Sequence, residues 1–356
     1  MKIVSYNLEK IALPSVDAKW RISAMALPTY DGVIVTLTTE DGSIGEGYGF
    51  PFPPLGETLG GCYQALEIMC RGLIGRDALA IQANMDFVRK AIPGNLAAKG
   101  GIDCALHDML SRVLKVPLYQ LLGGKTRSRI PLLRILSLKA PAEMRDKAVE
   151  LAGKGYRYLK LKVAGDLAED VERVRMVRQG VGKDVHLSVD PNQAYLTKDA
   201  INFSRRIEEY DISMIEQPVH FAHGAALEHV TRATAIAIEA DESATTVEQV
   251  MDLAANRRVD GINLKIPRSG GIQNVMTMAN ICAAAGLSCR LGANVGTRLL
   301  TAHAVHVGAA LANLDYACEL AEFERLADDP FEGLSIVDGD IVVPDEIGSG
   351  VRRRKS

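Results

Sequence analysis

The sequence has little cysteine and one tryptophan, and it lacks the motifs that define several protein classes. Its six cysteines form no C-x-x-C pair, which argues against zinc and dithiol redox motifs. Cys104, Cys282 and Cys318 lie in apolar helix or strand patterns, where a free thiol behaves as a small hydrophobic group. We therefore expect a reducing compartment, the cytoplasm. No P-loop, G-x-S-x-G elbow or G-x-G-x-x-G after a strand is present.

Charge of one sign and long apolar runs are also scarce. The formal net charge of -3 leaves no basic stripe for nucleic acid and no polybasic patch for a membrane surface. Charges at Lys2, Glu9 and Lys10 come too early for the apolar core of a signal peptide. The longest uncharged run near the C-terminus, 299–314, is too short to span a bilayer. We expect neither a nucleic-acid nor a membrane partner.

Short β-branched apolar runs recur between residues 158 and 265, and each ends on a charged side chain. From the second lysine onward the charged ends are about 25 residues apart, room for one strand, one crossover helix and two turns. In a parallel barrel, the carboxyl ends of all strands open on one face. The charged ends are Lys160 and Lys162, then Asp190, Glu216, Asp241 and Lys265.

Further strands are predicted around this repeat. The apolar patterns predict the first strand at 130–136, the seventh at 287–291 and the eighth at 314–320. Eight parallel strands alternating with helices predict an α/β fold of the TIM-barrel type. Residues 2–50 have strand patterns and 62–123 have helical ones, which indicates a separate N-terminal domain.

Three carboxylates at successive strand ends repel one another unless a cation lies between them. Oxygen-only ligation by Asp190, Glu216 and Asp241 favours a hard divalent ion, Mg²⁺ or alternatively Mn²⁺, over zinc. The alternative interpretation is structural: the same carboxylates could cap helices or pair with arginines.

Lysines precede and follow these carboxylates. Lys160 and Lys162 share one strand face, and Lys265 is expected across the barrel from them. Mutual repulsion and burial should depress the pKa of one member of the close pair, which suits a general base. A metal holding a substrate carboxylate would stabilise the enediolate that forms when the α-proton leaves. Schiff-base chemistry at one lysine is the alternative.

Weaker candidates surround this group. Asn192 points the same way as Asp190 and is a candidate substrate contact, Glu242 is expected to point away from the barrel centre, and Glu319 could orient substrate or be structural. Two apolar loops, 14–30 and 49–61, could cover the site or pack locally. Other side chains have structural or weak signals: His107, Asp108, His303 and His306 are interpreted as structural, and the 268–271 turn only weakly resembles an anion-binding nest.

At these residues the chain resembles the muconate lactonizing enzyme subgroup of the enolase superfamily. The matching segments include the Lys160-x-Lys162 pair, Glu216-Gln217-Pro218 and Ala240-Asp241-Glu242. The resemblance implies an α+β capping domain, residues 1–125 with 335–356 returning to it, over a modified (β/α)7β TIM barrel, residues 126–334. It also implies Mg²⁺ on the three carboxylates, Lys162 and Lys265 as the acid/base pair supported by Lys160, and a homo-oligomer. The 14–30 and 49–61 loops would then close over the substrate, with Trp20 and Tyr30 as candidate contacts.

The chain departs from some members of this group. The region after the seventh strand, 290–297, contains no histidine, so the histidine base of the mandelate racemase subgroup is not expected. The eighth strand has Cys318-Glu319-Leu320 where dipeptide epimerases typically have Asp-x-Asp. Glu319-Leu320 is more similar to the Glu-Leu of muconate cycloisomerases. The leading hypothesis rests instead on the two lysines expected on opposite faces, and it is a racemase or epimerase of an amino-acid derivative acting on a small carboxylate. A muconate-type cycloisomerase or a dehydratase of a hydroxy(imino) acid stays open, and a non-catalytic carboxylate-binding relative is a remote alternative.

Overall fold

The computed structural model describes residues 1–23, 25–26 and 28–355. The N-terminal domain, or cap, has an antiparallel sheet in the order β1-β2-β3 and three helices. Alternating apolar side chains of the central strand bury one face of this sheet against the helices. The helix α3 approaches β3 so closely that a Cβ on Gly47 would lie 2.0 Å from the Gly101 carbonyl oxygen. The cap elements are β1 (Ile3–Pro14), β2 (Thr29–Thr39), β3 (Ile44–Gly49), α1 (Leu59–Leu73), α2 (Ile81–Ala91) and α3 (Leu96–Leu114), with 3-10 turns η1 (Pro53–Leu55) and η2 (Leu118–Leu122).

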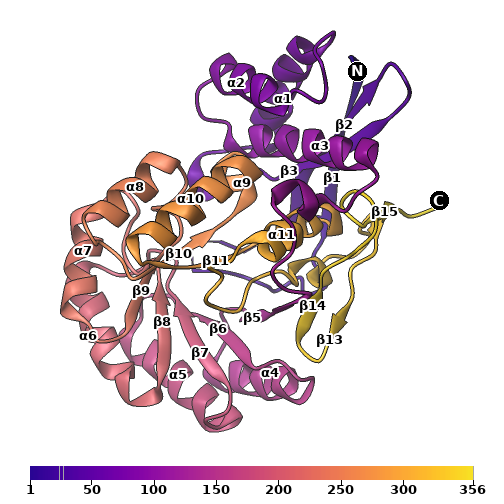
Figure 1. Cartoon of the computed structure of the whole chain (residues 1–356). Helices are drawn as coiled ribbons and strands as arrows, with labels where there is room; N and C mark the ends of the chain where they lie inside the picture. The colour runs from indigo at the N-terminus through magenta and orange to yellow at the C-terminus, as the bar shows by residue number, and fades with distance from the viewer. Residues whose placement is uncertain (24, 27, 356) are drawn as a thin grey trace.

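Seven parallel strands follow in the order β5 to β11, with helices on the outside, and they form the barrel that lies below the cap (Figure 1). The strands are β5 (Leu133–Leu136), β6 (Tyr158–Lys162), β7 (His186–Asp190), β8 (Ile212–Glu216), β9 (Ala237–Ala240), β10 (Gly261–Leu264) and β11 (Ser288–Leu291). The helices are α4 (Pro141–Gly153), α5 (Leu167–Val181), α6 (Thr197–Ile207), α7 (Gly224–Ala233), α8 (Val247–Ala255), α9 (Ile266–Ser269), α10 (Ile272–Ala285) and α11 (Arg298–Ala310), with η3 (Glu208–Tyr210). The fold is thus the expected α/β modified TIM barrel with an α+β cap.

The eighth strand is much shorter than the 314–320 segment expected from the sequence. It is reduced to bridges from Cys318 to Leu132 and from Glu319 to Gly292. Four backbone hydrogen bonds close the ring there, including Leu133 N to Cys318 O at 2.9 Å and Glu319 N to Leu291 O at 2.8 Å. The first strand is also shorter than expected, because β4 (Arg129–Pro131) pairs with β14 (Asp340–Val342) instead of with a barrel strand.

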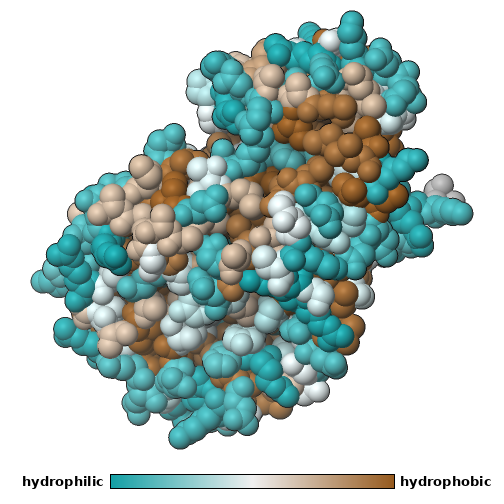
Figure 2. All heavy atoms as spheres, viewed as in Figure 1, coloured by the Kyte–Doolittle hydropathy of each residue, from teal (hydrophilic) through white to brown (hydrophobic). Residues whose placement is uncertain are grey.

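The C-terminal segment divides between the two parts of the molecule. Strand β13 (Ile336–Val337) pairs with β14, which continues onto β4, and β12 (Phe331–Glu332) pairs with β15 (Arg352–Arg353). Residues near the end contact the cap: Ser349 N donates to Asp108 Oδ1 at 2.9 Å, and Arg353 Nη1 pairs with Glu9 at 2.8 Å. Figure 2 shows apolar side chains gathered over α3 and at the junction of cap and barrel.

Polar groups of α3 hold the cap on the barrel. Asp103 Oδ2 accepts hydrogen bonds from Ile272 N and, at 3.2 Å, from Gln273 N at the start of α10. These two amide groups directly follow the 268–271 turn that weakly resembled an anion-binding nest. The turn itself uses the amides of Arg268, Ser269 and Gly271 for backbone hydrogen bonds to Lys265 O and Ile266 O. His107 Nδ1 lies 2.8 Å from the Asp103 carbonyl oxygen, and Arg112 Nε donates to Asp108 Oδ2 at 2.8 Å. These contacts agree with the structural roles expected for His107 and Asp108.

His306 lies fully buried in α11, where Tyr119 N donates to its Nδ1 at 3.3 Å. Burial lowers the pKa of His306 to about 4, with the neighbouring His303 acting in the same direction and Asp108 and Asp345 opposing it. The unfolded chain takes up this proton near pH 6.5 and the folded chain only near pH 4, so stability falls as the pH falls through this window.

We expect this histidine to cost the protein about 3 kcal/mol of unfolding free energy between pH 7 and pH 4. Urea unfolding of the native protein and of His306→Gln at both pH values measures the effect. The stability advantage of the native protein over the variant should shrink by that amount on acidification. An advantage that stays constant with pH would contradict the assignment.

Candidate active site

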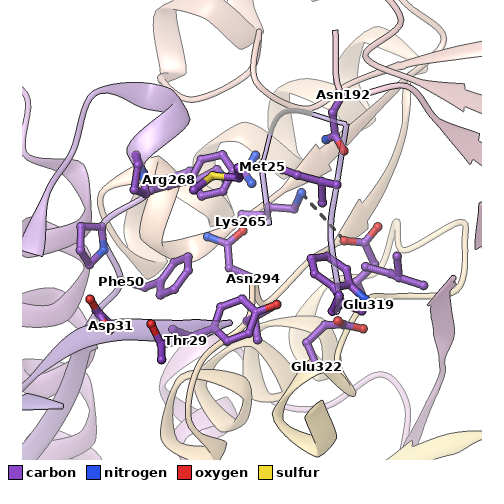
Figure 3. A pocket seen from close by; sticks show the side chains of 18 of the residues that line it. Met25, Thr29, Asp31, Phe50, Asn192, Lys265, Arg268, Asn294, Glu319 and Glu322 are labelled. Carbon is purple, nitrogen blue, oxygen red and sulfur yellow. Dashed lines mark ion pairs between the residues drawn. The ribbon is translucent and has the colours of Figure 1, made fainter. Parts of the chain in front are cut away.

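A cavity of about 290 Å³ lies where the cap meets the carboxyl ends of the barrel strands. Its apolar walls come from the two cap loops, and its polar floor comes from the barrel (Figure 3). Met25, Thr29, Asp31 and Phe50 face it from the cap, whereas Lys265, Asn294 and Glu319 face it from the barrel. The residues proposed for substrate contact from the sequence, Trp20, Tyr30, Asn192 and Glu319, all line it.

Lys160 is the most buried of the three lysines, with a side chain 1% exposed. Its Nζ contacts Glu319 and lies 2.5 Å from Glu216 Oε2 and 3.3 Å from Asp190 Oδ2. Burial alone would lower the pKa of Lys160, but the carboxylates of Glu216, Glu319 and Asp190 outweigh it and hold the pKa well above its usual range. The depression expected from repulsion between the two lysines is therefore not found at Lys160.

Lys162 ends β6 on the same face and lines the cavity. Its Nζ pairs with Asp190 Oδ2 and donates to Asn192 Oδ1 at 2.7 Å. Asp190 Oδ1 in turn accepts from Asn192 N at 2.8 Å, which fixes the turn after β7. Asn192 therefore orients the ammonium group of Lys162 from a position two residues beyond a strand end.

Lys265 follows β10, and its Nζ lies 2.7 Å from Asp241 Oδ2. Arg268 Nη1 reaches the same oxygen at 2.8 Å, and its guanidinium lies 4.0 Å from the centre of the Phe52 ring. Strands β6 and β10 are four steps apart in a ring closed by eight strand positions. Lys162 and Lys265 therefore stand on opposite sides of the cavity.

The three carboxylates expected to bind metal are brought to this floor but are held by cationic side chains. Asp190 pairs with Lys162, Glu216 with Lys160 and Arg290, and Asp241 with Lys265 and Arg268. Within the described ranges, no group of three or more His, Cys, Asp or Glu side chains is already gathered to hold a metal ion. Asp241 Oδ1 is buried with no hydrogen-bond partner among the described residues, so it keeps a free ligand position.

A buried ion network below the lysines was missed by the sequence reasoning. Arg290 of β11 is 1% exposed and contacts Glu239 of β9 at 2.6 Å, Glu216 at 2.7 Å and Glu319 at 2.5 Å. Asn263 Nδ2 donates to Glu216 Oε1 at 3.1 Å. Glu239 and Asn263 each lie two residues before a charged strand end, so strand alternation was the signal that could have identified them.

Two acidic side chains of this region have pKa values raised to about 7. For Glu239, burial raises the pKa and Arg290 opposes it. For Glu242, burial and then the charge of Asp241 raise it. Glu242 Oε1 lies 3.4 Å from Asn192 Nδ2, so this carboxyl braces the residue that orients Lys162.

Gln217 ties the ends of two neighbouring strands together. Its side-chain oxygen accepts from Asp241 N and Ser243 N, both at 3.0 Å, and its nitrogen donates to Val219 O at 3.0 Å and to Ser243 Oγ at 2.8 Å. The residue is fully buried, where water cannot replace these partners, and both polar atoms of its side-chain amide are hydrogen-bonded. Gln217 thereby sets the relative position of Glu216 and Asp241.

Replacement of Gln217 by leucine should lower the unfolding free energy by about 2–4 kcal/mol, because it leaves two buried N–H groups without an acceptor. Urea unfolding of the variant measures this loss. Gln179→Leu, a change of the same kind on the exposed face of α5, should cost less than about 0.5 kcal/mol. Equal losses in the two variants would show that the Gln217 bonds contribute little.

Comparison with known proteins agrees with this architecture. Residues 10–123 match the model of the mandelate racemase/muconate lactonizing enzyme N-terminal domain, and residues 143–355 match the model of the enolase C-terminal domain-like family. The chain therefore belongs to the mandelate racemase/muconate lactonizing enzyme family of the enolase superfamily.

Individual relatives narrow the class further. The hydrophobic dipeptide epimerase of Enterococcus faecalis is 34% identical over 89% of both chains, and chloromuconate cycloisomerase CbnB of Cupriavidus necator is 36% identical over 78% of this chain and 76% of its own. A dipeptide epimerase from E. faecalis, solved with Mg and the dipeptide L-Leu-L-Tyr, superposes with a TM-score of 0.94 at 30% identity over 99% of each chain. This chain is accordingly an isomerase of the family. None of its described helices is long and apolar enough to cross a membrane.

Proposed function

We propose that this enzyme removes the α-proton of a small carboxylate substrate with one lysine and returns a proton to the opposite face with another. The reaction would racemise or epimerise an amino-acid derivative. The observation that carries the proposal is that Lys162 and Lys265 line one cavity from strand ends on opposite sides of the barrel. Two-sided proton exchange needs a base on each face of the reacting carbon.

Asp190, Glu216 and Asp241 are proposed to hold Mg²⁺, or alternatively Mn²⁺. Their donors are all oxygens, as these ions prefer, and the unpartnered Asp241 Oδ1 offers a free ligand position. Binding requires the carboxylates to exchange lysine and arginine contacts for the ion. A divalent cation, when bound, supplies positive charge that stabilises negative charge developing on the substrate carboxylate.

The side chains of this chain then divide the remaining work. Lys162 Nζ and Lys265 Nζ each take a proton as the neutral amine or give one as the ammonium group. Asn192 Oδ1 orients Lys162, and Lys160 supplies fixed positive charge among Glu216, Glu319 and Asp190. Trp20, Tyr30 and the phenylalanines of the cap loops exclude water above the reacting carbon.

A second function deserves an equal test because of the cycloisomerase relative. Its similarity, together with Glu319 in place of the Asp-x-Asp motif, favours a muconate-type cycloisomerase as the alternative. Loss of water from a hydroxy(imino) acid would use the same lysines. Neither alternative interconverts two configurations of one substrate. A cycloisomerase closes a ring, and a dehydratase removes water.

Incubation with Mg²⁺ in D₂O separates these reactions. The panel contains L-Leu-L-Tyr, L-Ala-L-Glu, N-succinyl-L-lysine, proline-type imino acids and cis,cis-muconate, each followed by NMR and polarimetry. We expect deuterium at the α-carbon of an amino-acid derivative, with loss of optical rotation for a substrate with one stereocentre and a changed rotation for a dipeptide. Ring closure or loss of water without racemisation would favour the alternatives, and no exchange with any member would contradict the proposed function.

A further inference from the structure

One carboxylate of the cavity has no role in the chemistry proposed above. Glu322 begins the 3-10 turn η4 (Glu322–Arg325), directly after the short eighth strand, and lines the cavity from the barrel side (Figure 3). It is 2% exposed. Its Oε2 accepts from Arg325 Nη1 at 2.5 Å, whereas its Oε1 has no hydrogen-bond partner among the described residues.

Arg325 fixes this carboxylate without satisfying it. Its guanidinium lies 3.3 Å from the centre of the Trp20 ring, and its Nη2 donates to Tyr30 Oη at 2.8 Å. The arginine thus contacts the cap loop and one oxygen of Glu322. Its Nε is also buried without an acceptor among the described residues, so it makes no hydrogen bond to Oε1. A buried carboxylate oxygen without a donor costs free energy, and such atoms are usually satisfied by a ligand or by water.

The lysines of the cavity and Arg268 are already paired with other carboxylates. A donor for Glu322 Oε1 would therefore come from a bound molecule. Lys265 and Arg268 both pair with Asp241, and Lys162 pairs with Asp190. Asp31 also faces this cavity, from the cap, so a second carboxylate lines it beside the Glu322–Arg325 pair. An added cation is favoured there and an added carboxylate is repelled.

We propose that Glu322 binds a free, positively charged amino group of the substrate. This inference rests on the proposed function and narrows its substrate class to carboxylates that also carry an ammonium group, such as a dipeptide with a free amino terminus. It uses a residue three positions beyond Glu319, outside the segment where an Asp-x-Asp motif would lie. Dicarboxylates without a donor, such as muconates, are disfavoured.

Substrate pairs that differ only in this charge test the proposal. The pairs are L-Leu-L-Tyr and L-Ala-L-Glu with their N-acetyl forms, and N-succinyl-L-lysine with its Nε-acetyl form. The native enzyme should favour the free amine by about 10- to 100-fold in kcat/KM, as expected for a charge-assisted hydrogen bond. Glu322→Gln should remove this preference through a higher KM for the amine, with kcat nearly unchanged.

Glu324→Gln is the matched control. Glu324 lies on the same turn but pairs with Arg134 outside the cavity, so this variant should keep the native preference. A glutamine at 322 can still accept from Arg325, and the preference of the native enzyme tests the proposal even if that variant folds poorly.

The outcomes separate this proposal from the one it rests on. Proton exchange at equal rates for both members of each pair, or faster exchange of the acetylated members, overturns the role of Glu322 and leaves the proposed function intact. A Glu322→Gln enzyme that retains the amine preference does the same. Absence of α-proton exchange across all pairs contradicts the proposed function itself.

Discussion

Lys162→Ala and Lys265→Ala should each lower the rate of racemisation by at least about 10³-fold, because each removes the proton carrier on one face of the substrate. Each variant should still exchange the α-proton of one enantiomer with solvent, through the lysine that remains. The two variants should retain opposite enantiomers. Deuterium incorporation into the separate D and L forms, followed by NMR, measures this directly.

The matched control is Lys139→Ala. Lys139 pairs with Asp17 at 2.8 Å and does not line the cavity, so its removal should change the rate less than about twofold. If both lysine variants lost exchange of the same enantiomer, the two-face arrangement would be wrong and a one-base reaction would replace it. If Lys162→Ala or Lys265→Ala still racemised the substrate at the native rate, the lysine that was replaced would be excluded from the chemistry.

Arg290→Met should destabilise the protein by about 3–5 kcal/mol, the usual cost of removing one partner from a buried ion network. The guanidinium neutralises three carboxylates at once, and Lys160 reaches only Glu216 and Glu319 among them. Glu239 would be left without a cationic partner in the described part of the chain. Urea unfolding of the variant measures the loss.

A second substitution should recover part of that stability. Glu239→Gln in the Arg290→Met background removes the carboxylate that depends most on the arginine, so the double variant should be more stable than Arg290→Met alone by about 1–2 kcal/mol. An additive pair of losses would show that Glu239 and Arg290 do not stabilise each other.

The repeat of charged strand ends predicted the barrel because strand length and crossover length are physically constrained. Spacing placed Lys162, Asp190, Glu216, Asp241 and Lys265 on one face, and the structure brings them together. Their roles as metal ligands and proton carriers stay predictions. The position of Lys162 opposite Lys265 also followed from counting strands.

Other features could not be predicted from spacing. The eighth strand is reduced to two backbone bridges, which close the ring. So short an element has no apolar pattern by which the sequence could show its length. The pKa of Lys160 depends on Glu319, which is distant in the sequence and reaches it only through ring closure. The unpartnered oxygen of Glu322 depends on how Arg325 is oriented by Trp20 and Tyr30, which is a property of packing between cap and barrel.

Ring closure at Cys318 and Glu319 has a consequence for synthesis of the chain. Glu9 and Asp108 of the cap contact Arg353 and Ser349, which are translated 344 and 241 residues later. The cavity is lined by Glu319 and Glu322, so a nascent chain emerging from the ribosome cannot assemble it before these residues have been translated. Chains truncated before residue 318 would expose half-formed barrel strands, and these are the species that we expect chaperones to bind.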